Sequence, residues 1–261
     1  MSSTGPRGLR LAALCCVCLA WPVQAARDEA ALRACLAANA SAASFAQDIT
    51  ITQTDANGAI KRLSGRWYWR RGTPDQQAML KLAAPADLAG AAYLFLCKSG
   101  REAFYLYLPS LRKVRKVVGA TVAQSLFGSG LSAFDLKFLF SGLSGGQFSY
   151  VGPDQVGGRS GERWRYVPPS DPDILYERAD LVIDDLWCLP AKAELYGGVP
   201  WKTLTIDPAS VSQVDGRWRA GRVLMQDLRE GSRSEIRLGT EQTGQSLPAA
   251  LFDPTRFYRQ P

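Results

Sequence analysis

The chain of 261 residues contains no histidine. Histidine is the usual general base at neutral pH and the commonest metal ligand, so its absence disfavours most nucleophilic and metal-dependent catalysis. Residues 142–146 match the G-x-S-x-G pattern of a nucleophile elbow. That motif needs a histidine partner and a strand-turn-helix setting. We therefore interpret the match as a glycine- and serine-rich loop.

A second enzyme-like match, Ser110 and Lys113 in an S-x-x-K pattern, needs no histidine. The pattern is catalytic where a helix places both side chains on one face, and companion S-D-N and K-T-G motifs accompany it. Here it follows a strand pattern and Pro109, and the companions are missing. Cys35, Cys97 and Cys188 lie too far apart in sequence for metal-ligand spacing. We expect no catalytic residues, no metal and no cofactor, and a protein that is not an enzyme.

Apolar runs of spanning length, roughly 20 residues, are also missing. Residues 11–21 are apolar, follow Arg7 and Arg10, and precede a small-x-small site that ends at Ala25. This pattern is typical of a secretory signal peptide, so we predict export and cleavage after Ala25. Residues 26–261 then form a single domain of 236 residues with 29 basic and 24 acidic side chains, a net charge of +5.

Cysteine is scarce, and three of the six cysteines leave with the signal peptide. Cys35, Cys97 and Cys188 remain, which allows one disulfide in an oxidising compartment. We favour a Cys97–Cys188 bond because both residues occupy strand-like contexts. The sequence leaves the other pairings open.

The remaining sequence predicts mainly antiparallel β structure after a first helix at residues 27–40. Residues 45–54 and 60–69 alternate in polarity across Asn57-Gly58, a strong hairpin signal. Residues 120–145 interrupt the strands and predict a helical turn or two around residues 134–140, and the chain closes with a short helix and a packed tail. A sheet of about ten or more strands must curl or close. Further strands are expected at residues 78–82, 91–97, 102–108, 114–118, 148–151, 162–167, 175–183, 188–196, 202–206, 217–228 and 235–240.

The predicted sheet carries apolar side chains on both faces. In residues 104–108, Tyr105 and Tyr107 point one way while Phe104, Leu106 and Leu108 point the other. Such a sheet needs cover on both faces or a ligand on one, and few helices are expected. Ordinary core packing explains the same aromatics about as well. As candidate cavity and lid residues we select Trp67, Trp69, Phe95, Tyr105, Tyr107, Phe127, Leu131, Phe134, Leu136 and Phe138.

Several ordered motifs carry a family resemblance over roughly residues 43–258. A Pro-x-Asp-x-x-Gly turn is followed by a Tyr-Leu-Pro strand end, a basic strand and a degraded Gly-Ser-Asp-Phe-Ser-Tyr-x-Asp-Leu segment. In this order the chain resembles the periplasmic outer-membrane lipoprotein-sorting proteins, the LolA-like family, in the branch associated with RND/MMPL-type exporters. Gly130, Leu131 and Ala133 depart from the family pattern. The matching positions are Pro85, Asp87, Gly90, Tyr107, Leu108, Pro109, the basic residues 112–116, Gly128, Ser129, Ser132, Asp135 and Leu136.

The resemblance implies a half-open, curled β-barrel of about 10–11 strands, mainly antiparallel (α+β), with a few helices over its mouth. It implies a monomeric periplasmic carrier that holds acyl chains of a lipoprotein or lipid and moves them towards the outer membrane. Its expected partners are an RND/MMPL-type inner-membrane exporter and an outer-membrane acceptor. A sensor of lipid or lipoprotein that regulates a membrane partner is the alternative, and a Ser–Lys hydrolase is the least favoured function.

Arg112, Lys113, Arg115 and Lys116 form a cationic segment directly after the apolar strand. Export removes nucleic acid as a partner. The two-residue period of a strand separates Lys113 and Arg115 from Arg112 and Lys116, so the cations fall on both faces. We hypothesise that they meet lipid headgroups or an acidic partner at the barrel mouth.

Overall fold

The computed structural model describes residues 27–40, 44–72, 75–99, 101–141, 143, 145–169 and 175–259. The predicted signal peptide lies outside these residues, as do Gly142 and Ser144 of the G-x-S-x-G match. Among the described residues, no helix has the length and apolar character to cross a bilayer. The helices are α1 (Glu29–Ala38), α2 (Ala133–Ser141) and the short 3-10 segments η1 (Gly119–Ala123), η2 (Leu126–Gly128), η3 (Pro208–Ser210), η4 (Ala249–Phe252) and η5 (Phe257–Arg259).

The strands follow one another along the chain with short connections. The first group is β1 (Ser44–Thr54), β2 (Ile60–Arg71), β3 (Gln76–Ala84), β4 (Ala92–Lys98), β5 (Arg101–Leu108) and β6 (Lys113–Val117). After α2 come β7 (Gln147–Val156), β8 (Arg159–Val167), β9 (Arg178–Asp184), β10 (Pro190–Gly197) and β11 (Val199–Ile206). The last are β12 (Val211–Val214), β13 (Arg217–Ala220), β14 (Arg222–Asp227), β15 (Ser232–Leu238) and β16 (Gln242–Thr243).

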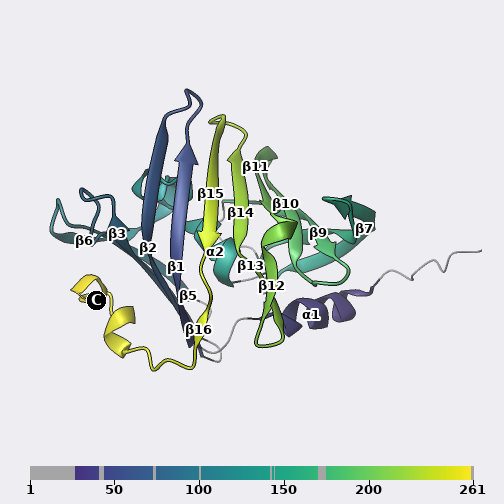
Figure 1. Ribbon diagram of the computed structural model, residues 1–261, viewed down its shortest axis with the longest axis horizontal. Coiled ribbons are helices and arrows are strands. Elements are labelled where there is room, and N and C mark those ends of the chain that lie inside the picture. The colour runs from purple at the N-terminus through teal and green to yellow at the C-terminus, as the bar shows by residue number, and fades with distance from the viewer. Residues whose placement is uncertain are drawn as a thin grey trace, which may run out of the picture.

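One sheet of 14 strands contains all but the β12–β13 hairpin, in the order β6-β5-β4-β3-β2-β1-β15-β14-β11-β10-β9-β8-β7, with β16 added beside β1. Every pairing is antiparallel. The sheet curls without closing, because its edge strands β6 and β7 do not pair with each other (Figure 1). This confirms the predicted half-open barrel.

The predicted strand number of about 10–11 was too low. Residues 217–228, expected as one strand, divide at Gly221 into β13 and β14. The turn at Asp215 and Gly216, both with positive φ, folds β13 back on β12 as a separate hairpin. An Asp-Gly pair favours this turn because its positive φ angles cost glycine little, so the signal was present in the sequence and was missed.

The hairpin of β1 and β2 forms where Asn57-Gly58 predicted it. Gly58 has a φ of 84°, and the Asp55 carboxylate accepts hydrogen bonds from the backbone N–H groups of Asn57 and Ala59, each at 2.9 Å. The turn sets the register Thr54↔Ile60. That register places Phe45 opposite Trp69 and Gln47 opposite Trp67, all on the concave face.

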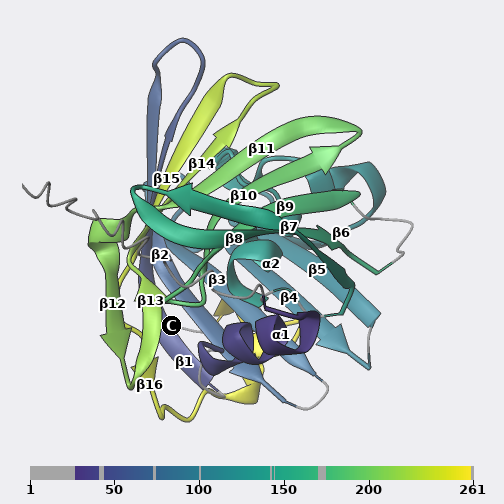
Figure 2. The same ribbon diagram turned by 90° about the vertical axis from the view of Figure 1, so that its right-hand side faces the viewer.

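Both faces of the sheet bury apolar side chains, as the alternation predicted, and both carry covering segments. Helices α1 and α2 lie on the concave side (Figure 2), and α2 confirms the helical turns expected around residues 134–140. The C-terminal segment lies on the outside of β3, β4 and β5, where Leu251, Phe252 and Phe257 are buried. This confirms the expected packed tail.

Two of the predicted cavity residues lie on the wrong face for that role. Tyr105 and Tyr107 pack in the outer cluster, and the ring of Tyr107 stacks on Tyr258 of the tail at 3.9 Å. The alternation of β5 was predicted correctly, and Phe104 instead faces the interior cluster. Periodicity separates two faces but does not tell which one is concave.

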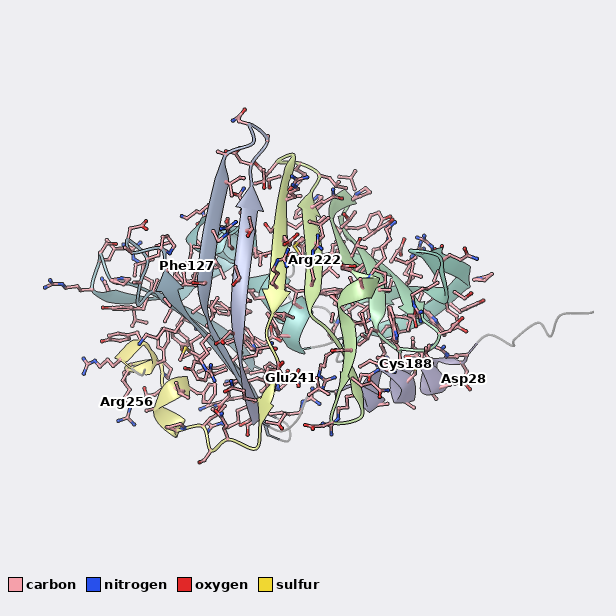
Figure 3. All side chains as sticks on the ribbon, viewed as in Figure 1. Asp28, Phe127, Cys188, Arg222, Glu241 and Arg256 are labelled. Atoms are coloured by element: carbon pink, nitrogen blue, oxygen red, sulfur yellow. A yellow bond between two sulfur atoms is a disulfide. The ribbon has the colours of Figure 1, made fainter. Side chains whose placement is uncertain are left out.

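The disulfide prediction was also wrong, because Cys188 bonds to Cys35 and not to Cys97. Cys97 lies on β4, and β3, β2, β1, β15, β14 and β11 separate that strand from β10 in the sheet. Cys188 lies in the β9–β10 turn, at the end of the molecule where α1 packs (Figure 3). The bond therefore ties α1 to the sheet across a sequence separation of 153 residues.

Candidate functional site

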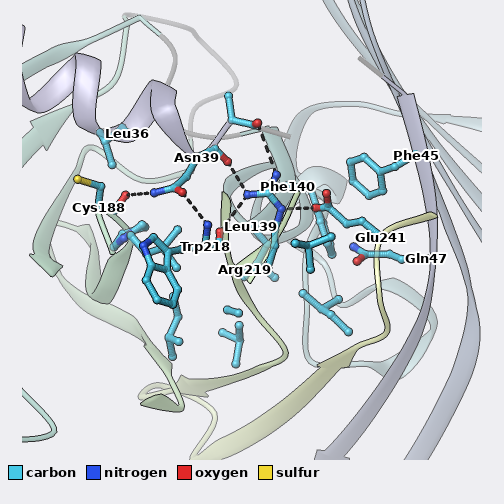
Figure 4. Close-up of a pocket in the computed structure, with 18 of the residues that line it drawn as sticks. Leu36, Asn39, Phe45, Gln47, Leu139, Phe140, Cys188, Trp218, Arg219 and Glu241 are labelled. Atoms are coloured by element: carbon cyan, nitrogen blue, oxygen red, sulfur yellow. Dashed lines mark hydrogen bonds and ion pairs between the residues drawn. The ribbon is translucent and has the colours of Figure 1, made fainter. Parts of the chain in front are cut away.

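A pocket of about 660 Å³ opens on the concave face of the sheet (Figure 4). Its walls come from the end of α1, the end of α2, the β12–β13 hairpin, the β9–β10 turn and the interior side chains of the central strands. Most of these side chains are apolar. They include Leu36, Phe45, Phe138, Leu139, Phe140, Leu143, Leu189, Leu204, Ile206, Trp218, Val223 and Leu238.

Helix α2 supplies one wall of the pocket through Phe138, Leu139 and Phe140. The ring of Phe140 also stacks on Trp67 of β2, with ring centroids 4.1 Å apart. Residues Leu131 and Leu136, before and within α2, are almost fully buried against the sheet. The helix therefore fills part of the barrel interior and sets the size of the space that remains.

A buried charge network holds the start of α2 in place. Asp135, with a side chain that is 0% exposed, accepts hydrogen bonds from the Tyr176 hydroxyl at 2.5 Å and from the Lys202 ammonium at 2.6 Å. Its carboxylate also accepts from the backbone N–H of Ser132 at 2.7 Å. Lys202 of β11 donates further to the carbonyl of Gly130 at 3.1 Å and lies 3.6 Å from Asp227.

This network affects the chemistry of Tyr176 in particular. Burial and the neighbouring Asp135 carboxylate raise the pKa of the Tyr176 hydroxyl far above its usual value, so the hydroxyl stays a donor to Asp135. A separate hydrogen bond holds the loop before α2, since the Ser234 hydroxyl donates to the carbonyl of Ser129 at 2.7 Å. Sequence reasoning matched Asp135 and Ser129 to a family motif but found no partner for them.

The β12–β13 hairpin closes the opposite wall and is attached to the end of α1. The side-chain oxygen of Asn39 accepts a hydrogen bond from the backbone N–H of Trp218 at 2.8 Å, and Arg219 donates to the Asn39 carbonyl at 2.7 Å (Figure 4). Arg219 also forms an ion pair with Glu241 at 2.8 Å. The Cys35–Cys188 bond lies beside these contacts, since Cys188 also lines the pocket.

The structure places the predicted cavity and lid residues at different depths. Phe138 lines the pocket. The buried core beneath it holds Trp67, Trp69, Phe95, Leu131 and Leu136, while Phe127 and Phe134 are partly buried against that core. Sequence reasoning missed pocket residues on later strands, such as Leu204, Ile206 and Val223. Apolar and polar residues alternate around them as in any strand that packs against a core, so the pattern gave no sign of a pocket.

The four cations of the basic segment lie at the free edge of the sheet, away from the pocket lining. Arg112 lies in the β5–β6 turn and the other three on β6; all four are exposed, and no ion pair to another described residue is present for any of them. In the β5–β6 register, Lys113 and Arg115 share a face with Val117, and Lys116 shares the other with Val114. The three cations of β6 therefore fall on both faces as predicted, whereas Arg112, expected on the face of Lys116, lies in the turn with a positive φ and on neither strand face.

The enzyme-like pattern of Ser110 and Lys113 has no helical setting in the structure. Ser110 lies in the turn after β5 and Lys113 begins β6, and both are exposed. No group of three or more potential metal-ligating side chains comes together within the part of the chain that is described.

Known proteins share this architecture. A DUF1329 family protein from Desulfovibrio piger aligns with a TM-score of 0.78 and 20% identity, over 85% of this chain and 94% of that one. A putative outer membrane lipoprotein-sorting protein domain from Vibrio parahaemolyticus gives 0.77 and 19%, over 87% and 97%. A LolA superfamily protein from Nitrosomonas europaea gives 0.68 and 18%, over 85% and 97%. The fold is therefore LolA-like.

The family follows from the sequence comparison. A family model with the description "uncharacterized protein" matches residues 74–259, more than two thirds of the chain. The chain belongs to this family, and its LolA-like fold agrees with the resemblance found in its motifs. A search of the curated proteins gives no significant match.

Proposed function

We propose that the protein is a periplasmic carrier that binds the acyl chains of a lipoprotein or lipid and delivers them towards the outer membrane. The observation that carries this proposal is the mainly apolar pocket of about 660 Å³ on the concave face of a LolA-like sheet. A pocket of this size lies within the range that encloses a small ligand. Its walls offer an acyl chain apolar contacts on several sides.

The energetics of chain burial favour a carrier that needs no catalysis. Each buried methylene contributes about 0.8 kcal/mol, so ten methylenes contribute about 8 kcal/mol before the entropic costs of binding. An affinity of this size keeps the acyl chain bound while the protein is in water, but it still allows transfer of the chain to a partner of similar affinity. The aromatic end of α2 and the β12–β13 hairpin both line the pocket, and we propose that they gate it.

The proposed location and the proposed partners of the protein are supported mainly by its sequence. The predicted signal peptide supports export, and the Cys35–Cys188 disulfide is consistent with an oxidising compartment. The domain proposed to function there is residues 26–261. The exposed cations of β6 and the preceding turn provide a surface for anionic lipid headgroups or for an acidic partner, such as an RND/MMPL-type exporter or an outer-membrane acceptor.

Lipid extraction and mass spectrometry of the protein purified from periplasm test the proposal. The wild type is expected to carry acyl lipid in near-stoichiometric amounts. A Leu204→Trp variant, which fills the pocket from β11, is expected to carry much less, whereas the matched Val199→Trp change at an exposed position of the same strand leaves the amount unchanged. Wild-type protein that contains no lipid and accepts none when acyl lipids are added would contradict the proposal.

A further inference from the structure

One edge of the large sheet is open to further pairing. Strand β6 is the outermost strand (Figure 1), and β5 is the only described strand that hydrogen-bonds to it. Residues 113–117 pair with β5 without a shift in register. In an antiparallel pair, alternate residues direct their backbone N–H and C=O groups away from the partner strand. Strand β6 therefore presents a regular row of backbone donors and acceptors on its free side.

The opposite edge of the sheet lacks this regularity. Strand β7 contains Pro153, which has no N–H to donate, and its pairing with β8 shifts register between Tyr150 and Gly152. A proline or a bulge keeps an edge strand from pairing with another chain. Strand β6 has neither feature, so of the two edges it is the one that can accept an added strand.

The side chains of β6 restrict which strand can be added. Lys113, Arg115 and Lys116 are exposed, and the exposed Arg112 precedes them in the turn. None of the four forms an ion pair with another residue in the described part of the chain. A second copy of β6 would place like charges opposite one another, which destabilises a strand pair. An acidic strand would instead place an opposite charge beside each cation.

The cations also lie where an added strand can reach all of them. In the β5–β6 register, Arg115 is opposite Leu106 of the interior cluster, and Lys116 is opposite Tyr105 of the outer cluster. These two neighbouring cations therefore point to opposite faces of the sheet. A bilayer that lies against one face of the sheet meets only the cations of that face. A strand beside β6 has side chains on both faces.

We propose that β6 binds an extended acidic segment of a partner protein by strand addition. The backbone of the segment pairs with the free side of β6, and its carboxylates pair with the cations on both faces. Leu111 and Val118, 48% and 55% exposed at the two ends of β6, offer apolar contacts to the ends of the segment. This inference rests on the partner surface named in the proposed function and adds the chemistry of the partner and its mode of binding.

A synthetic acidic peptide tests the proposal. The peptide Thr-Val-Glu-Glu-Val-Glu-Glu-Thr, when it runs antiparallel to β6, places valine opposite the two valines of β6 and glutamate opposite its three cations. Binding of the fluorescein-labelled peptide to the full protein is measured by fluorescence anisotropy. The same peptide with N-methylated backbone amides keeps every charge but cannot donate backbone hydrogen bonds. This form is expected to bind at least about tenfold more weakly, as the loss of one or two hydrogen bonds implies.

Single charge reversals test the two faces of β6 separately. Arg115→Glu and Lys116→Glu are each expected to weaken peptide binding about fivefold or more, because an added strand contacts both side chains. Arg62→Glu is the matched control, since Arg62 is exposed on β2 and its reversal changes the net charge by the same amount. This control should stay within about twofold of the wild-type affinity in physiological salt, where charges far from the peptide are screened.

Hydrogen exchange reports on the backbone pairing directly. With the peptide bound, amide protons of β6 should exchange more slowly, whereas exchange in β7 at the other edge should not change. Equal binding of the peptide and its N-methylated form, or unchanged exchange in β6 at saturation, overturns strand addition. Binding that is weakened by only one of the two charge reversals also overturns it. If vesicles of phosphatidylglycerol bind through these cations and the peptide does not, the partner is a membrane surface and the inference is wrong.

Failure of this inference is distinguishable from failure of acyl carriage, because lipid content is measured separately. A protein that carries acyl lipid but does not bind the peptide overturns strand addition and leaves carriage intact. A protein that binds the peptide in the expected way but contains and accepts no lipid supports strand addition and overturns carriage.

Discussion

Replacing Lys202 by methionine removes the only cation that contacts the buried carboxylate of Asp135 within the described residues. The methionine keeps an unbranched aliphatic side chain, so little packing is lost. The change eliminates the hydrogen bonds from Lys202 to Asp135 at 2.6 Å and to the Gly130 carbonyl at 3.1 Å. It leaves the carboxylates of Asp135 and Asp227, 0% and 9% exposed, without their shared counter-ion.

The expected loss in free energy of unfolding is about 3–5 kcal/mol, the cost of breaking a buried ion pair by removing one partner. Asp135→Asn is expected to cost less, about 1–3 kcal/mol. In that variant Lys202 keeps Asp227 at 3.6 Å, and an asparagine oxygen still accepts a hydrogen bond. The double variant should lose less than the sum of both, because the two residues form one network.

Urea unfolding followed by tryptophan fluorescence measures these values. Lys137→Met is the matched control on α2, because Lys137 pairs with Glu102 at 2.6 Å but both side chains are more than 20% exposed. Such a pair contributes about 1 kcal/mol or less. If Lys202→Met costs no more than Lys137→Met, or if the losses at Asp135 and Lys202 simply add, the network does not hold α2 in place.

Three further predictions concern other parts of the molecule. Cys35→Ser should lower the free energy of unfolding in urea by about 2–5 kcal/mol, because the bond to Cys188 closes a loop with a sequence separation of 153 residues. Burial favours a raised pKa for Asp184, but hydrogen bonds from Arg159 and two backbone N–H groups outweigh it and hold the pKa of this carboxyl below its usual value. Asp184→Asn should therefore destabilise the protein at neutral pH, and in urea titrations this deficit should shrink as the pH falls through the folded-state pKa. Glutamate at all four positions of the basic segment (Arg112, Lys113, Arg115, Lys116) should slow transfer of a fluorescent acyl lipid from anionic vesicles at least about tenfold, with an unchanged melting temperature.

Each of these has a distinct contrary result. If the reduced wild-type protein is more stable than Cys35→Ser, part of the loss in that variant comes from the serine itself and not from the missing disulfide. A deficit in Asp184→Asn that is constant from pH 7 to pH 2 would show that the charge of Asp184 contributes nothing. Transfer at the wild-type rate after charge reversal would make the basic segment an ordinary solvated sheet edge.

Local signals predicted the parts of this fold that local physics determines. Asn57-Gly58 predicted the first hairpin because its turn tolerates positive φ, and alternation predicted most strands because one side chain in two is buried. The acidic start and alanine-rich body of residues 27–40 likewise predicted α1, whose Asp28 accepts a hydrogen bond from the N–H of Ala31. Asp215-Gly216 carried the same kind of signal for the β12–β13 hairpin.

Long-range contacts could not be predicted in this way. The bond between Cys35 and Cys188 depends on where α1 docks, and no local pattern contains that information. The ion pair of Asp135 with Lys202 joins residues 67 positions apart on a helix and a strand. The pocket itself lies between elements from both ends of the chain, so only Phe138 among the predicted cavity residues lines it.

Photo-crosslinking tests most directly whether an acyl chain occupies this pocket. The full protein is irradiated with a lauric ester that carries a diazirine near the end of its chain, and the labelled peptides are mapped by mass spectrometry. Labels are expected on pocket-lining peptides from α2, β11 and the β12–β13 hairpin, and these labels should be lost in Leu204→Trp. Labels confined to the outer face, such as the tail around Phe257, or no saturable labelling, would contradict it.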